Sequence, residues 1–496
     1  MTILSDDPGQ SEPRDPVTEA NTDPERLRNP GPASHRNGWW MLLAIALVTI
    51  IVRLALLPDR DGTRALDPSG DSLAYVELAE GLRHGCGFAR LHDGKCLNPE
   101  IDRTPGYPLF LATFSNFRAA LIVQVLLAGA IVFAAGAFVY LNWGIGAALV
   151  ASTFIALDLP SIVYAAELMT ETLFTACFAL ATLLALYALN GNPRVQRLLI
   201  PMLGASALLS FGLLTRPIGE FGLAVPAILV LLVSSAPWPQ RLGLQLLLLS
   251  LPLLTIAGWS LRNHAVAGVA APSSIGASNF FYYRAGGTLA FSSGSGWLGA
   301  VNQLGTRPEN HLTSDAFAII EQHPLAFAEM TTWSLLFVAL APVRTPLDHI
   351  LGVQQSFPIQ DPGSIRLRAD LRTLATSPRA ALVTIYRNEF DGSPAITALT
   401  GLQMFSVILL WIGVIAGLSF ASTRSYRGAC ILILAATAFV LMLLAAGPEG
   451  TARLRIPTLP FLAMVAGVGW TRLATRRRAQ RRRRRIQPSS LRASPT

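Results

Sequence analysis

The chain has 496 residues, of which 52% are hydrophobic and only 14% are charged, and its formal net charge is +9. Soluble domains carry about 25% charged residues, so this chain has too few to cover a globule of its size with polar surface. It also contains many apolar runs of about 18 residues or more, the length that a bilayer core demands. These features exclude a cytosolic enzyme, a secreted domain and a disordered scaffold. They predict an all-α, multi-spanning membrane protein.

Both ends of the chain are polar. Eight arginines lie between Arg476 and Arg485, after the last apolar run. A basic cluster beside a membrane span is typical of a cytoplasmic anchor that also contacts anionic lipid. We therefore interpret 476–496 as a cytoplasmic tail and expect no nucleic-acid partner. Residues 1–37 are rich in Pro, Asp, Glu, Asn and Arg, which predicts a disordered tail, also cytoplasmic.

Between the tails, the membrane-embedded domain is predicted to occupy 38–475. Ten apolar runs predict ten spans: 39–57, 118–140, 144–163, 168–189, 198–215, 218–234, 242–260, 400–421, 428–446 and 456–474. Arginines in alternate short loops lie on the same side as the basic tail, which places 59–117 and 261–399 outside. A further run at 325–342 is predicted to lie at the outer surface or to re-enter the membrane, although an eleventh span is the alternative.

Cysteines and glycines in these segments carry weaker signals. Cys86 and Cys96 lie in the first outer segment, where their spacing permits a small-loop disulfide without proving one. Cys177 and Cys430 fall inside spans and are expected to be inert core residues. The glycine-rich segment 286–299 lacks the lysine and the strand–helix context of a phosphate loop, so we interpret it as a mobile outer loop.

Arginines at the outer ends of spans violate the positive-inside pattern and need a reason. There are five of them: Arg103, Arg216, Arg262, Arg453 and Arg455. Guanidinium groups suit phosphate, so one explanation is an anion site at the outer leaflet. The alternative for each arginine is snorkelling to lipid headgroups or pairing with a local carboxylate. Five arginines on one face of the membrane favour the anion site over these alternatives.

Carboxylates near the outer face are equally notable in so apolar a chain. Asp71 opens DSLAYVELAEGL, which predicts a surface-lying amphipathic helix. Spacing alone favours Asp71 as its N-cap, and a catalytic base at the membrane surface is the alternative. Asp102 precedes Arg103 in IDRTPGYPLF. Glu167 and Glu171 are four residues apart in AAELMTETLF, so both are predicted to face one side of the fourth span.

Taken together, these motifs resemble membrane-embedded glycosyltransferases of the GT-C type. The resemblance is greatest to the protein-mannosyltransferase, aminoarabinose-transferase and rhizobial core-sugar transferase group, and it covers roughly 39–475. The segments that carry it are, in order, Asp71 with Tyr75 and Ala79, RTPGYPLFLA at 103–112, ELMTETLF at 167–174, TRP at 215–217, WSLRNHAVAG at 259–268 and RLRIPTLPFLA at 453–463.

The resemblance implies a polyprenyl-phosphate sugar donor and an acceptor that is an envelope lipid, a glycan or a protein. It implies that Asp71 deprotonates the acceptor hydroxyl, that Asp102 and Arg103 form an acid–base pair, and that Glu171 or Glu167 is the second-loop acid. It also implies a bacterial plasma membrane, with the active site on the extracytoplasmic side. This chain has Arg-Thr-Pro-Gly where the aminoarabinose transferases have Lys-Pro-Pro. A divalent metal is possible, and Asp102 and Glu171 are the candidate ligands.

Such a reaction passes through an oxocarbenium-like state, and a single displacement inverts the configuration at the anomeric carbon. The outer arginines, Arg216, Arg262 and Arg453 above all, are expected to bind the leaving phosphate, with Arg455 beside them. Two alternatives remain. A transporter or lipid flippase typically shows internal repeats and mid-bilayer charges, neither of which is evident here. A polymer ligase using a lipid carrier is consistent with the long outer segment 261–399.

Overall fold

The computed structural model describes residues 32–57, 71–189, 195–225, 227–228, 237–308, 311–341, 362–389 and 394–486. Within these residues the fold is helical, with one addition to the predicted all-α class. That addition is a two-stranded antiparallel hairpin formed by β1 (Ala89–His92) and β2 (Lys95–Pro99).

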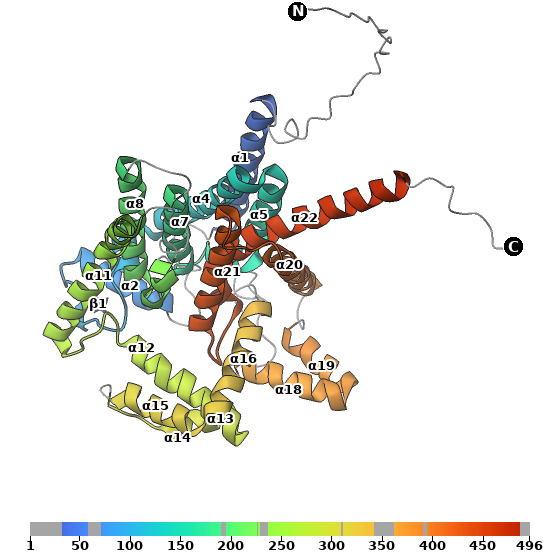
Figure 1. Cartoon of the computed structure of the whole chain (residues 1–496). Helices are drawn as coiled ribbons and strands as arrows, with labels where there is room; N and C mark the ends of the chain where they lie inside the picture. The colour runs from blue at the N-terminus through green and yellow to red at the C-terminus, as the bar shows by residue number, and fades with distance from the viewer. Residues whose placement is uncertain are drawn as a thin grey trace, which may run out of the picture.

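Seven helices in the described part of the chain are long and apolar enough to cross a membrane. They are α1 (Pro32–Ala55), α4 (Phe117–Trp143), α7 (Glu171–Leu189), α11 (Trp238–Ala267), α20 (Pro394–Leu418), α21 (Tyr426–Ala445) and the combination of η4 (Ala452–Thr458) with α22 (Leu459–Ile486). They correspond to seven of the ten predicted spans. The chain is therefore a multi-span helical membrane protein (Figure 1).

Of the other three predicted spans, 144–163 is interrupted, 198–215 forms the apolar part of α8 (Val195–Thr215), and 218–234 is described only in part. The additional run at 325–342, which was not one of the ten, forms α16 (Pro324–Leu340). The run at 218–234 begins with α9 (Gly219–Gly222) and then lies largely outside the described residues. The total of ten spans thus stays a prediction.

The prediction of one continuous helix over 144–163 is wrong, because the helix is interrupted at Asp158. Helix α5 (Ile145–Leu157) ends there and α6 (Leu159–Tyr164) begins. The Asp158 carboxylate accepts hydrogen bonds from the backbone N–H and the hydroxyl of Ser161, and from Gln403 Nε2 at 3.1 Å. Gln403 in turn accepts from the Leu159 N–H. An aspartate N-cap with proline in the following turn favours a new helix start over continuation.

Close backbone contacts hold α22 inside the bundle. A Cβ atom on Gly469 would lie 2.0 Å from the Gly413 carbonyl oxygen, and one on Gly417 would lie 2.4 Å from the Val465 carbonyl oxygen. Glycines spaced four apart allow membrane helices to approach this closely. Beyond these contacts, α22 continues past the bundle with its arginine-rich end (Figure 1).

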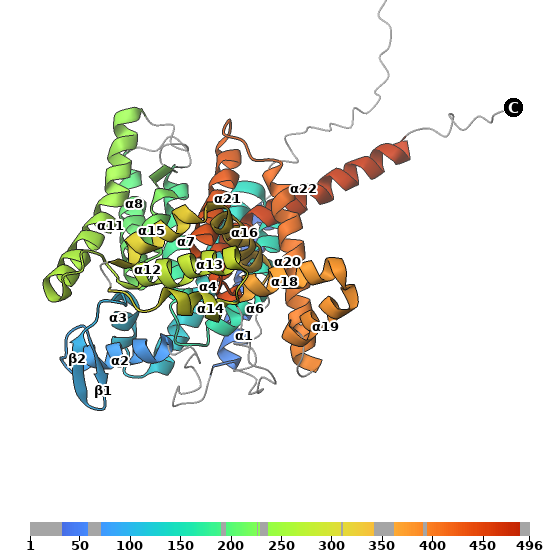
Figure 2. The same cartoon turned by 90° about the horizontal axis from the view of Figure 1, so that it is seen from below.

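The second predicted outer segment folds into a group of short helices on one side of the bundle (Figures 1 and 2). They are α12 (Ile275–Ser278), the π-helix η2 (Asn279–Ala285), α13 (Gly286–Ser293), α14 (Trp297–Leu304), α15 (Leu312–Gln322), α16, α18 (Gly363–Thr376) and α19 (Pro378–Glu389). The interpretation of 286–299 as a loop is therefore wrong. Gly287 serves packing, because a Cβ there would lie 2.8 Å from the Pro448 ring.

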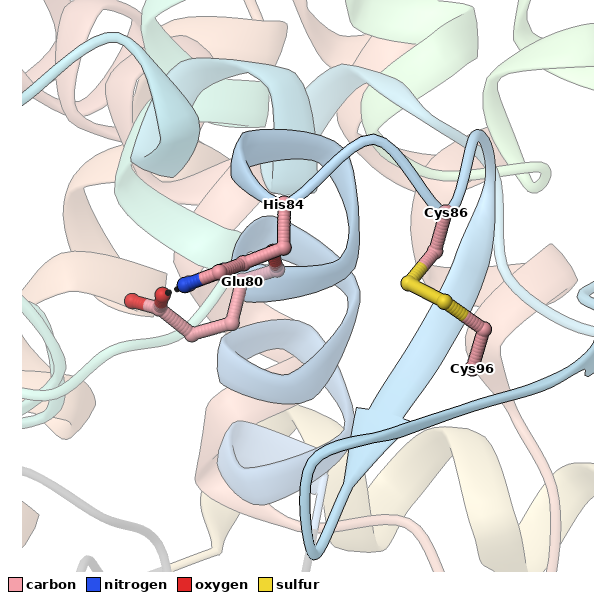
Figure 3. The surroundings of a disulfide bond; sticks show 4 residues. All are labelled: Glu80, His84, Cys86 and Cys96. Atoms are coloured by element: carbon pink, nitrogen blue, oxygen red, sulfur yellow. Dashed lines mark hydrogen bonds and ion pairs between the residues drawn. A yellow bond between two sulfur atoms is a disulfide. The ribbon is translucent and has the colours of Figure 1, made fainter.

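The first outer segment contains α2 (Asp71–Arg83), the β1–β2 hairpin and α3 (Gly106–Ala112) at one edge of the molecule (Figure 2). A disulfide joins Cys86 to Cys96, next to the helix end where Glu80 pairs with His84 (Figure 3). The structure thus contains the small-loop disulfide that the spacing of the two cysteines permitted but did not prove. Cys177 and Cys430 are buried, as predicted.

Candidate active site

Five charged side chains form one continuous series of ion pairs. Arg103 Nη2 lies 2.6 Å from Asp71 Oδ1, and Arg453 Nη1 lies 3.2 Å from Asp71 Oδ2. The same Arg453 donates through Nε to Glu171 Oε1, which also accepts from Arg216 Nη1 at 2.6 Å. The order is Arg103–Asp71–Arg453–Glu171–Arg216, so a guanidinium group stands at each end. We call these five residues the charge series.

Burial distinguishes the two carboxylates of the charge series. Glu171 is fully buried, whereas the Asp71 side chain is 27% exposed. Glu171 begins α7, where the helix dipole stabilises a negative charge. Its Oε2 atom is also buried and has no hydrogen-bond partner among the described residues. Asp71 is thus the carboxylate of the series that an incoming substrate can reach from water.

The turn RTPG brings Arg103 to the end of α8. A Cβ on Gly106 would lie 2.6 Å from the Leu214 carbonyl carbon and oxygen, so only glycine allows α3 to approach α8 this closely. Arg216 follows α8 directly. The turn itself is organised by Glu100, whose Oε1 accepts from the Asp102 and Arg103 N–H groups. The conspicuous proline and glycine of this motif therefore have a packing role beside the site.

Glu167 lies outside the helix that was predicted to carry it. Helix α7 begins only at Glu171, and 165–170 is not helical, so the two glutamates do not share a helix face. Gln124 Nε2 donates to the Glu167 backbone carbonyl at 3.0 Å and fixes this segment against α4. The Glu167 side chain is buried.

Each arginine of the charge series lies over an aromatic ring. The guanidinium carbon is 5.9 Å from the Tyr75 ring centre for Arg103, 6.0 Å from Phe174 for Arg216 and 6.0 Å from Tyr164 for Arg453. Such contacts stabilise a cation and remove it partly from water. Burial raises the pKa of the Tyr75 hydroxyl, so it stays protonated at neutral pH. Each arginine of the charge series therefore has an aromatic ring beside it.

Besides Glu167, three of the predicted site residues lie outside the charge series. Asp102 accepts from Ser274 through its carboxylate and from Ser273 through its backbone carbonyl, so it fastens the turn to the start of the second outer segment. Arg262 donates to the backbone carbonyls of Phe88 and Glu100.

The third residue, Arg455, is almost completely buried and donates to the carbonyls at the end of α16: Val338, Ala339 and Ala341. Helix η4 therefore carries two arginines with different partners. Arg455 anchors η4 on α16, and Arg453 faces the charge series. Charge at the outer end of a span identified both arginines, but it could not separate these two functions.

The residues proposed for a divalent metal do not fit one. Metals of this class require several oxygen ligands free to coordinate. Glu171 instead has two guanidinium groups against one oxygen, and Asp102 is bonded to Ser274. Across the described part of the chain, no cluster of three or more His, Cys, Asp or Glu side chains is arranged to hold an ion.

Sequence reasoning missed Glu100 and Gln124, both of which position the site through backbone groups. Glu100 is buried, and its second oxygen accepts from Arg90 Nε at 2.6 Å across the hairpin. Gln124 lies in the apolar helix α4 and also accepts from the Tyr107 hydroxyl. A buried polar residue inside an otherwise apolar span was the available signal for Gln124.

Comparisons with known proteins give structural matches only. No family model matches the chain, and no curated protein does. The oligosaccharyltransferase of Archaeoglobus fulgidus in the apo form matches with a TM-score of 0.45 and 12% identity, over 89% of this chain and 52% of that one. The archaeal oligosaccharyltransferase AglB of the same organism, in complex with an inhibitory peptide and a dolichol-phosphate, matches with a TM-score of 0.45 and 12% identity over 92% of this chain and 52% of that one.

ArnT from Cupriavidus metallidurans, bound to undecaprenyl phosphate, matches with a TM-score of 0.35 and 16% identity, over 86% of this chain and 76% of that one. The chain thus spans about half the length of the oligosaccharyltransferase it matches, 52%. Over most of its own length, this protein is structurally similar to an archaeal oligosaccharyltransferase and to ArnT.

Proposed function

We propose that this protein transfers a sugar from a polyprenyl-phosphate donor to an acceptor hydroxyl on the extracytoplasmic face, by a single inverting displacement. The observation that carries the proposal is the charge series, with its exposed carboxylate between two arginines. An anionic donor needs cations at the outer membrane surface, and an attacking hydroxyl needs a nearby base. The charge series supplies both the cations and the carboxylate, in side chains that form ion pairs with one another.

Phosphate binding and base activation are coupled in this arrangement. Both oxygens of the Asp71 carboxylate already accept from a guanidinium group, one from Arg103 and the other from Arg453. A donor phosphate competes with Asp71 for Arg103 and Arg453. Once the phosphate withdraws one of these partners, Asp71 becomes free to accept a proton. Donor binding therefore precedes acceptor activation.

In this displacement, one bond forms at the anomeric carbon and one bond breaks. The acceptor O–H gives its proton to the Asp71 carboxylate, and its oxygen forms the bond to the anomeric carbon. The bond from that carbon to the phosphate oxygen breaks, and its electron pair leaves on polyprenyl phosphate. Arginine side chains of the series, with Arg216 at the far end, stabilise the charge that develops on the leaving phosphate.

The test is donor consumption by the purified full chain. We would supply a panel of undecaprenyl-phosphate sugars together with an extract of envelope lipids, glycans and proteins as the acceptor source. One donor should be consumed, with release of undecaprenyl phosphate and transfer of label to an acceptor. If no donor is consumed, while the chain in liposomes moves a labelled lipid between leaflets, the transporter alternative replaces this proposal.

A further inference from the structure

Helices α18 and α19 form a helical hairpin at the edge of the molecule, beside α20 (Figures 1 and 2). Ser377 is the one residue between them, and its backbone is bonded to both helices. Its N–H donates to the Thr373 carbonyl, and its carbonyl accepts from the Ala381 N–H at 3.1 Å. Ala381 is fully buried, and the main contact of α19 is with α18. The two helices are therefore one unit.

Helix α18 attaches this hairpin to the other outer helices. Arg368 lies 2.8 Å from Glu329 of α16, and its guanidinium carbon lies 4.5 Å from the centre of the Phe291 ring of α13. Ser364 donates to the Pro448 carbonyl from both its N–H and its hydroxyl, the latter at 3.2 Å. Pro448 belongs to the 446–451 loop between α21 and η4. The hairpin is thus bonded to the end of a membrane span.

Two further outer elements hold the same region. Arg284 of η2 donates to the carbonyls of Leu443 and Leu444 at the end of α21, at 3.2 and 2.7 Å. Gly287 allows α13 to approach the Pro448 ring. The 446–451 loop is therefore fixed by three outer elements, and α18 is one of them.

One face of α19 leaves apolar side chains uncovered. Leu382, Val383 and Tyr386 are 60%, 45% and 54% exposed, and Arg379 is exposed as well. The last three residues follow Arg379 at three, four and seven positions, so all four lie on one face of the helix. We call these four residues the α19 stripe. It combines a cation with a continuous apolar surface.

The chain itself places the α19 stripe close to the bilayer. Helix α19 ends at Glu389, and α20, which is long and apolar enough to cross a membrane, begins at Pro394. A chain of that length can separate the two helix ends by at most about 18 Å. Leu402 and Phe405, near the start of α20, are also exposed, as expected of side chains that face lipid. The end of α19 is therefore near the level at which α20 enters the membrane.

We propose that α19 lies in the headgroup region of the outer leaflet, with Leu382 and Val383 toward the acyl chains and Arg379 on lipid phosphates. Helices with an apolar face and arginines bind membrane surfaces in this orientation. A guanidinium group suits phosphate, and a tyrosine ring is favoured at the interface. The proposal does not depend on the transferase function. It gives the outer helical segment an attachment to the membrane besides the spans.

The test uses the full chain in vesicles of phosphatidylethanolamine and phosphatidylglycerol, with one spin label at Leu382→Cys or at Thr384→Cys. Thr384 is exposed on the opposite face of α19 and is the matched control. The native cysteines are buried or bonded to each other, so they should not react. EPR power saturation measures collisions of each label with oxygen, which concentrates among acyl chains, and with a water-soluble nickel chelate. The label at 382 should favour oxygen, and the label at 384 should favour nickel.

A charge variant tests the contact with phosphate. Arg379→Gln should raise the nickel accessibility of the label at 382 by up to about fivefold, because one arginine near an anionic membrane surface strengthens binding by about that factor. Arg307→Gln changes another exposed arginine of the outer segment, in a different element, and should leave the label unchanged.

Three results would overturn the proposal. Equal nickel accessibility at 382 and 384 would show that the α19 stripe faces water. Low accessibility of the label at 382 to both reagents would show that protein, such as a second copy of the chain, covers the stripe. An unchanged label in Arg379→Gln would refute the contact with phosphate. None of these results bears on the transferase proposal, which donor consumption tests separately.

Discussion

Asp71 and Arg453 are 382 positions apart in the sequence, and their side chains form a 3.2 Å ion pair in the folded chain. The pair joins the start of α2 to η4, which leads into α22. Because Arg453 also binds Glu171, it links a partly exposed carboxylate to a buried one.

Asp71→Asn should reduce turnover by about two to four orders of magnitude, because the amide cannot accept a proton. Donor affinity should not fall, since Arg103, Arg216 and Arg453 remain in place and the carboxylate that competes with the phosphate loses its charge. Turnover and donor binding would be measured on the same preparation. Asp93→Asn, at the 91%-exposed side chain in the hairpin, is the control. If Asp71→Asn retained more than about a tenth of normal turnover, the base would have to be sought elsewhere.

Arg453→Met should lower thermal stability as well as activity, because it leaves the buried Glu171 with Arg216 as its single cationic partner. Breaking a buried ion pair can cost about 3–5 kcal/mol. Adding Glu171→Gln should restore much of the melting temperature without restoring turnover. Arg103→Ala removes one of the two partners of a partly exposed carboxylate, so its melting temperature should fall less. Equal melting temperatures for Arg453→Met and Arg103→Ala would contradict the burial argument. Thermal unfolding in detergent provides the measurement.

Gly287→Ala should impair activity, because the new methyl group would lie 2.8 Å from the Pro448 ring and displace the 446–451 loop. Gly276→Ala is the matched control, since a Cβ there meets nothing within 4 Å. Both substitutions replace a helical glycine in the outer segment. Turnover should fall in the first variant and stay normal in the second. Normal turnover in both would show that the loop accommodates the methyl group without consequence for the site.

The His92 imidazole should titrate above its ordinary pKa of 6.5, because it is hydrogen-bonded to Glu77 at 2.7 Å and lies close to Asp93. Its folded-state pKa is raised, so the pair's contribution to stability is fully present below pH 6.5 and is lost as pH rises through the folded value. NMR titration of labelled histidine would measure it. Glu77→Gln should bring the pKa of His92 back toward 6.5, and an unchanged titration would refute the pairing.

Single cysteines introduced at Asp93, Leu298 and Gln480 would test the predicted orientation. Leu298 is 69% exposed on α14, and Gln480 is exposed on α22. The native Cys177 and Cys430 are buried and Cys86 is bonded to Cys96, so background labelling should be low. A membrane-impermeant reagent should label 93 and 298 in intact cells and should label 480 only after permeabilisation. The opposite labelling pattern would show that the protein has the inverse orientation in the membrane.

The sequence singled out the five residues of the charge series as candidates, because charged residues are conspicuous in so apolar a chain. Four of its members, Arg103, Arg216, Arg453 and Asp71, lie at outer span ends or begin a surface helix. Their mutual pairing was not predictable, because it depends on contacts such as that between Gly106 and the end of α8.

Some placements could not be predicted from the sequence. Arg262 and Arg455 also lie at span ends, but they donate to backbone carbonyls, which no side-chain pattern reveals. Glu167 and Glu171 were predicted to share a helix face from their spacing of four residues, but α7 begins only at Glu171.

The three contacts that fix the 446–451 loop have a consequence for engineering. Arg284, Gly287 and Ser364 all belong to the outer helical segment, and the loop they hold leads directly to Arg453. Exchanging that segment with one from another enzyme to alter substrate choice would therefore also shift an arginine of the charge series. A working chimera should keep the recipient's helical segment and its 446–451 loop together, or take both from the donor enzyme. The boundary of the graft then does not separate the segment from the loop.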